Sequence, residues 1–175
     1  MAEQYGVLNS YLNSFVSKIL ENDDLCKLLY YNTNDDIISK PNLNAEQKLE
    51  LIGSNILINK RVPLIQKEAK PLLMLRIVEV QYANKKTTTI EDVRIMCYIV
   101  CANSVVETEN GTRDLCIVTA LDKTFEDSQS GDIGIGKIRK LRTSDLADLG
   151  TEYQGYAVNY LISDFNTSYV RDKWS

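Results

Sequence analysis

Residues 71–82, PLLMLRIVEVQY, and residues 93–106, VRIMCYIVCANSVV, are the two stretches of the sequence that decide the fold. Both are long runs of aliphatic, β-branched and aromatic residues, which favour extended strands. The polar residues KKTTTIED, 85–92, lie between them and are typical of a turn. Two β-rich runs joined by a polar tip predict a long antiparallel β-hairpin.

The residues before this hairpin predict helices. Residues 7–20 carry apolar side chains with the spacing of an amphipathic helix, and residues 25–31 predict a second, shorter helix. Residues 32–44, NTNDDIISKPNLN, are polar and predict a surface loop. Residues 44–47 resemble a capping box, which predicts a short third helix that ends near Gly53. The apolar stripe of the first helix consists of Leu8, Tyr11, Leu12, Phe15, Val16, Ile19 and Leu20.

The residues after the hairpin predict one more helix and two strands. The stretch ETENGTRD, 107–114, is expected to turn, and residues 113–125 then follow a helical period. The stretch KIRKLRTSD, 137–145, has a basic face and predicts a strand, and GYAVNYLISDF, 155–165, alternates as a strand does. The helix is expected to present Leu115, Val118, Leu121 and Phe125 to the sheet, with Asp114 and Asp122 elsewhere.

This order of elements predicts the α+β fold class. We expect a single domain over residues 1–175, in which an antiparallel sheet with a long β-hairpin packs against two or three helices. Residues 166–175 are expected to form an extended C-terminal tail that becomes ordered only by contact with another molecule.

The net charge and the hydropathy of the chain argue against two classes of partner, nucleic acid and membranes. The chain has a formal net charge of −4 and a pI of about 5.0, which argues against a protein that grips nucleic acid through a basic face. No apolar run has the length of a membrane span, and the N-terminus lacks the pattern of a signal peptide. We therefore expect no membrane partner, and expect the chain to stay in the compartment where it is made.

Cysteine and histidine content bear on catalysis and metal binding. The four cysteines, Cys26, Cys97, Cys101 and Cys116, lie in apolar surroundings and are expected to be buried and reduced. They lack the C-x₂-C spacing of a zinc site. The chain has no histidine, which excludes Ser–His and Cys–His nucleophile pairs and histidine-based metal sites.

Two motifs keep an enzyme hypothesis open. The stretch GDIGIGKI, 131–138, approaches a phosphate-binding loop, but Ile138 occupies the position of the hydroxyl residue that binds Mg²⁺. We interpret it as a glycine turn that leads into a strand. Residues 68–70, Glu-Ala-Lys, match part of a metal-dependent nuclease core, with Asp35 or Asp36 as the further carboxylate. Alternating charges before Pro71 are more typical of a solvated connector. We assign no catalytic, cofactor-binding or metal-binding residue, and expect no cofactor.

The long hairpin, the helix GTRDLCIVTALDKTF, the turn GIGKIRKL and the closing stretch YQGYAVNYLISDFN together resemble the tail terminators and related neck proteins of tailed bacteriophages. This resemblance covers about two-thirds of the chain and concerns length and element order, not invariant residues. It implies a virion protein of the tail or neck, made in the host cytoplasm and not an enzyme. Such a protein forms a homo-hexameric ring that caps the tail tube and joins the tail to the head completion proteins.

The resemblance also implies partners. The partners are further copies of the chain, the tail tube protein, the tail sheath as an additional candidate, and the connector proteins of the head. DNA passes through the ring without sequence-specific binding. We expect the hairpin tip, 83–92, and the tail, 166–175, to make these contacts, with Asn84, Lys85, Lys86, Thr87, Tyr169 and Trp174 as the interface residues. Another neck or head–tail connector subunit is the alternative, and a protein-binding adaptor or a small enzyme is a weaker one.

Overall fold

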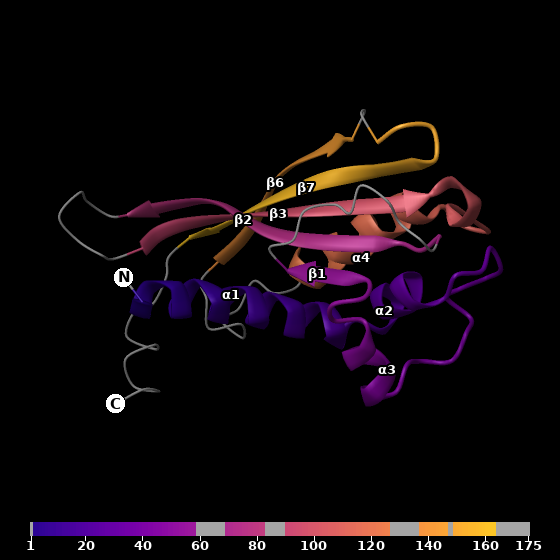
Figure 1. Cartoon of the computed structure of the whole chain (residues 1–175), viewed down its shortest axis with the longest axis horizontal. Helices are drawn as coiled ribbons and strands as arrows, with labels where there is room; N and C mark the ends of the chain where they lie inside the picture. The colour runs from indigo at the N-terminus through magenta and orange to yellow at the C-terminus, as the bar shows by residue number, and fades with distance from the viewer. Residues whose placement is uncertain (1, 59–68, 83–89, 127–136, 147–148, 164–175) are drawn as a thin grey trace.

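The central strand of the sheet is β3 (Ile90–Ala102), which pairs on both sides with a long antiparallel strand. These neighbours are β2 (Leu72–Tyr82) and β7 (Tyr153–Ser163), and the strand order is β1-β2-β3-β7-β6 (Figure 1). The edge strand β6 (Lys137–Asp145) is antiparallel to β7, whereas β1 (Ile56–Ile58) is parallel to β2. The computed structural model describes residues 2–58, 69–82, 90–126, 137–146 and 149–163.

The helices α1 (Ala2–Glu21), α2 (Asp23–Tyr30) and α4 (Arg113–Glu126) lie on one side of this sheet, and the short α3 (Ala45–Glu50) lies next to α2 (Figure 1). Asn22 caps α2 by accepting a hydrogen bond from the Leu25 amide at 3.0 Å. The predicted capping box of α3 is confirmed. The chain between β3 and α4 forms a turn of 3-10 helix, Asn103–Val105, and a small hairpin of β4 (Glu107–Thr108) and β5 (Gly111–Thr112).

The main core lies between the sheet and the helices. Alternate residues of β3 point into it and are buried, because successive side chains of a strand face opposite sides of the sheet; they are Val93, Ile95, Cys97, Ile99 and Cys101. The rings of Phe15 in α1 and Phe125 in α4 stack at 4.0 Å, and Tyr160 in β7 lies 5.3 Å from Phe125. This aromatic cluster fixes both helices against the sheet.

A smaller apolar cluster lies on the opposite face of the sheet, at the end where β3 finishes. Leu57, Leu72, Met74 and Val100 form its buried part. Leu146 and Leu149, from the connection between β6 and β7, pack against it, as does Tyr153 at the start of β7. The described residues of the connection therefore cover this end of the second face.

The predicted α+β fold with its long hairpin and helices is confirmed, with three corrections. Leu115 does not face the sheet but is 45 % exposed, whereas Asp114 is fully buried. Val118, Leu121 and Phe125 are buried as predicted, and Ile117, which the prediction left out, is buried with them. Strand β1 was not predicted, since three residues carry too little periodicity to be recognised. None of the described helices has an apolar stretch long enough to cross a membrane.

The prediction that all four cysteines are buried is correct for three of them, since Cys116 is half-buried. Burial raises the pKa of Cys26 to about 11 and that of Cys101 to about 12, and also raises the pKa of Cys97. These three thiols therefore stay protonated at neutral pH and act as small apolar core side chains.

We predict that Gly155→Ala destabilises the protein by about 3 kcal/mol, because a Cβ at this position in β7 would overlap the carbonyl oxygen of Ile99 in β3. Urea denaturation followed by circular dichroism measures the change. Ser144→Ala on the neighbouring strand is the control and is expected to change the free energy of unfolding by less than about 0.5 kcal/mol. Equal stability of the two variants would contradict this close approach of β7 to β3.

Candidate interaction surface

The interface residues predicted from the sequence lie outside the described residues. They are Asn84, Lys85, Lys86 and Thr87 in the hairpin tip and Tyr169 and Trp174 in the tail. The hairpin stem is described up to Tyr82, and both Tyr82 and Val78 on β2 are 42 % exposed.

For the phosphate-loop-like stretch, the structure confirms the predicted strand, whereas the predicted glycine turn lies outside the described residues. Residues 131–136 are not among those described, but Lys137 begins strand β6. A phosphate-binding loop leads instead into a helix, whose N-terminal amides help to hold the phosphates.

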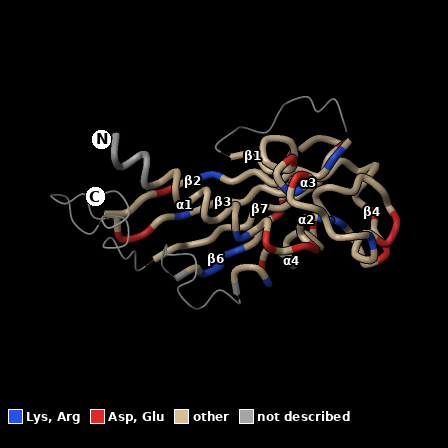
Figure 2. Tube along the Cα trace, turned by 90° about the horizontal axis from the view of Figure 1, so that it is seen from below, with Lys and Arg blue, Asp and Glu red and all other residues tan. Residues whose placement is uncertain are grey.

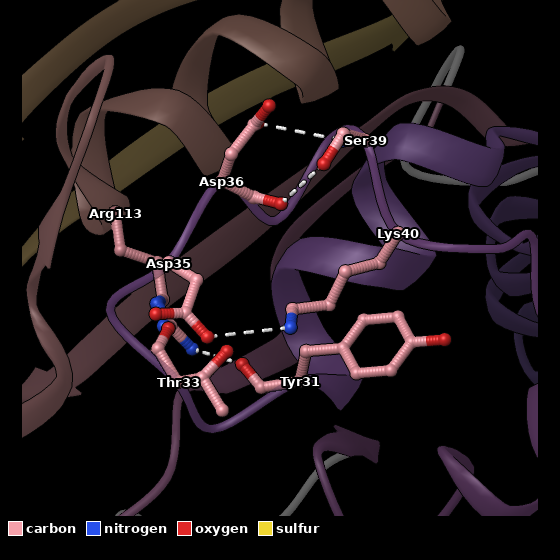
Figure 3. Close-up of polar contacts among 7 residues, drawn as sticks. All are labelled: Tyr31, Thr33, Asp35, Asp36, Ser39, Lys40 and Arg113. Atoms are coloured by element: carbon pink, nitrogen blue, oxygen red, sulfur yellow. Dashed lines mark hydrogen bonds and ion pairs between the residues drawn. The ribbon is translucent and has the colours of Figure 1, made fainter.

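The carboxylates proposed for a nuclease site have other partners. Asp35 forms an ion pair with Lys40 at 3.5 Å, and the Asp36 carboxylate accepts a hydrogen bond from the Ser39 amide at 3.4 Å (Figure 3). Glu68 lies outside the described residues. Among the residues that the structure does describe, no group of three or more Cys, Asp and Glu side chains is arranged to hold a metal ion.

Arg113, the first residue of α4, holds the loop after α2 in place. Its side chain is fully buried, and its guanidinium donates hydrogen bonds to the carbonyl oxygens of Tyr31, at 2.5 Å, and Thr33 (Figure 3). Tyr31 is the C-cap of α2, where a cation is favoured by the partial negative charge of the helix end. Burial lowers the pKa of Arg113 from its usual value. The contact joins two segments about 80 residues apart in the sequence.

The same loop is fixed at further points. Lys27 donates to the carbonyl oxygen of Ile38 at 2.8 Å, and the Tyr31 hydroxyl donates to that of Pro41 at 3.1 Å. The Asn34 amide contacts the carbonyl oxygen of Ser104 at 3.4 Å, which places the loop beside the turn that precedes β4. These contacts bring four carboxylates to one end of the molecule, which we call the acidic end: Asp35 and Asp36 from the loop, and Glu107 and Glu109 from the β4–β5 hairpin (Figure 2).

No described helix lies on the sheet face opposite the helices, which we call the open face (Figure 1). Strand register defines it, because directly paired residues share a face. One row across four strands consists of Arg76, Met96, Asn159 and Arg142. The next row consists of Glu79, Arg94, Leu161 and Arg139. Tyr98 lies in the adjacent row, beside Met74, and packs against the small apolar cluster.

The open face is predominantly basic. Arg94 pairs with Glu79 at 2.8 Å, while Arg76, Arg139 and Arg142 form no ion pair with a described residue. Figure 2 shows Lys and Arg along β2 and β6, and Asp and Glu at the β4 end. About eight residues of β3 separate Arg94 from the end of that strand, a distance of about 26 Å. The arginines of these rows are therefore far along the sheet from Glu107 and Glu109 of the β4–β5 hairpin, whereas Glu79 lies among them.

A buried polar atom without a partner lies in the middle of the open face. Asn159 is only 8 % exposed, and its side-chain oxygen has no hydrogen-bond partner in the described part of the chain. Its register neighbours are Met96 and Arg142. A buried amide oxygen without a hydrogen bond costs about 1–3 kcal/mol, so a donor from another molecule would stabilise this position.

Sequence reasoning recognised the basic character of residues 137–145 but not the surface to which they contribute. The alternation of Ile138 with Arg139 could have indicated a strand with one apolar face and one basic face. The positions of Arg76 and Asn159 in the same row depend on pairing between strands far apart in the sequence, which no local pattern reveals.

The fold and this surface define a class of protein: an α+β domain with one helix-covered sheet face and one arginine-rich face on which no described helix lies. A family model described as YomW matches residues 22–162, so the chain belongs to the YomW family. The family name is associated with phages of the SPbeta type, which indicates a phage origin. A comparison with curated proteins finds no match.

We predict that Arg113→Met lowers the free energy of unfolding by about 3 kcal/mol, because the carbonyl oxygens of Tyr31 and Thr33 lose their buried donor. Hydrogen exchange measured by mass spectrometry should also become faster in residues 31–36. The exposed Arg139→Met is the control, with an expected change of less than about 0.5 kcal/mol. Unchanged exchange in the loop of the Arg113 variant would show that Arg113 does not hold it.

Proposed function

We propose that this protein is a structural component of the phage neck, a tail terminator that assembles into a hexameric ring, caps the tail tube and joins the tail to the head completion proteins. The observation that carries the proposal is the open face. It exposes Arg76, Arg139 and Arg142 together with the partly buried Met96 and Tyr98. Arginine, methionine and tyrosine are enriched in protein–protein interfaces.

The free edge of the sheet supports the same proposal. Strand β6 is nine residues long, and no described strand pairs with its outer side. An unpaired edge offers backbone groups to a strand of another chain. The basic side chains of β6 discourage indiscriminate pairing, so a specific neighbour is favoured over aggregation.

The partners in this proposal are neighbouring copies of the chain, the tail tube protein, the tail sheath as a further candidate, and the head connector proteins. DNA would cross the ring through its central channel without being bound by sequence. The protein would reside in the neck of the virion after synthesis in the host cytoplasm. The phage origin indicated by the family name is consistent with this place. A neighbouring neck or head–tail connector subunit is the alternative role.

We predict that the purified chain forms rings, alone at high concentration or on the ends of tail tubes. Sedimentation velocity should detect a particle of about 119 kDa, corresponding to six chains of 19.9 kDa each. Negative-stain images should show a central hole, or a cap on tube ends that is absent from tubes prepared without the chain. A chain that stays monomeric over all concentrations and leaves tube ends bare would contradict the proposal.

A further inference from the structure

We propose that the open face of one copy of this chain receives the acidic end of a second copy. In this arrangement Glu107 and Glu109 of one copy approach Arg139 and Arg142 of the next. The inference rests on the proposed ring function and extends it by naming both sides of the contact. A contact between two different surfaces is heterologous, which is the type of interface that builds rings.

Charge complementarity is the first argument. Arg76, Arg139 and Arg142 have no ion pair with a described residue, and Glu107 and Glu109 likewise have none within the described part of the chain. The two sets lie at different places along the sheet, so they do not neutralise each other within one molecule (Figure 2). A symmetric contact of two open faces would instead place arginines opposite arginines, which is unfavourable.

The buried amide of Asn159 is the second argument. Its side-chain oxygen lacks a donor in the described part of the chain, although it lies on an otherwise accessible face between Met96 and Arg142. An approaching backbone or side-chain donor would satisfy it. When Arg142 turns toward a carboxylate of the second copy, one of its other N–H groups remains available to this oxygen, because a guanidinium has five donors.

The fixed geometry of the acidic end is the third argument. Arg113 and Asn34 attach the loop of residues 31–36 beside the β4–β5 hairpin. Thr108 additionally closes that hairpin by donating to the carbonyl oxygen of Gly111 at 2.6 Å. A surface that is ordered before binding loses little conformational entropy on association, so even a modest set of ion pairs contributes to affinity.

Nucleic acid is a less suitable occupant of the open face. The chain has a net charge of −4, and Glu79 lies within the basic rows, where it already neutralises Arg94. A polyanion would also be repelled by the acidic end. The few arginines of the open face are enough to pair with a small acidic surface such as the acidic end of a second copy.

The test uses paired charge reversals in the full-length chain. The face variant carries Arg139→Glu and Arg142→Glu, and the end variant carries Glu107→Lys and Glu109→Lys. Each variant alone should self-associate at least tenfold more weakly than the unsubstituted chain, measured by sedimentation velocity. An equimolar mixture of the two should recover association, because opposite charges then meet at both contacts. The acidic open face of the face variant meets the lysines of the end variant, and the basic open face of the end variant meets the acidic end of the face variant.

Controls separate this contact from general effects of charge. The variant with Glu46→Lys and Glu50→Lys on the exposed surface of α3 changes the net charge as the end variant does, and should associate normally. Circular dichroism of each variant reports whether it is folded. Binding of a single-stranded DNA oligonucleotide is measured alongside, and none is expected at physiological salt.

The outcomes distinguish this inference from the proposed function. If the unsubstituted chain forms rings and the folded face and end variants do so equally well, the contact is wrong while the ring function stands. If the unsubstituted chain never associates, even with tail tubes, both are wrong. Tight DNA binding that is lost only in the face variant, with self-association unchanged, would assign the open face to nucleic acid and overturn the inference.

Discussion

The alternation of side chains along β3 is the constraint on which the rest of the structure depends. Every second residue from Val93 to Cys101 must be buried, and the helices α1, α2 and α4 supply that cover. The same alternation directs the intervening residues, including Arg94 and Met96, to the opposite face. One strand therefore determines both the core and the open surface. Within the described part of the chain, the end of that surface nearest Val100 gains an apolar cover from Leu146 and Leu149 of the β6–β7 connection.

The buried guanidinium of Arg113 links this core to the acidic end. Arg113 bonds to carbonyl oxygens at the end of α2, while the adjacent Asp114 accepts from Gln154 of β7 at 2.7 Å. Burying a charge costs free energy, and removing one partner of a buried charged group destabilises a protein strongly because the group is left without compensation. In return, the hydrogen bonds of Arg113 hold the polar loop in one orientation relative to α4 and the sheet. An electrostatic contact with another molecule depends on that orientation.

Local sequence patterns were sufficient to predict most of the secondary structure, but they predicted little of the arrangement of side chains on the open face. The hairpin, the first helix and the capping box at Asn44 follow from periodicity and short-range hydrogen bonds, which the sequence displays directly. The corrections concern strand β1 and the first turn of α4, where Asp114 is buried and Leu115 is exposed because of contacts with residues far away in the sequence. The row that contains Asn159 required the register of four strands. The interface residues predicted in the hairpin tip and the tail lie outside the described residues, so their role stays a prediction.

A reconstruction of the assembled particle by cryo-electron microscopy would show directly whether the open face is a contact between copies of the chain. We predict that each open face is covered by a neighbouring copy, with carboxylates of the β4–β5 hairpin close to Arg139 and Arg142 and a donor within hydrogen-bond distance of Asn159. An assembled particle in which the open face lies free in solvent, with the copies joined through other surfaces, would contradict it.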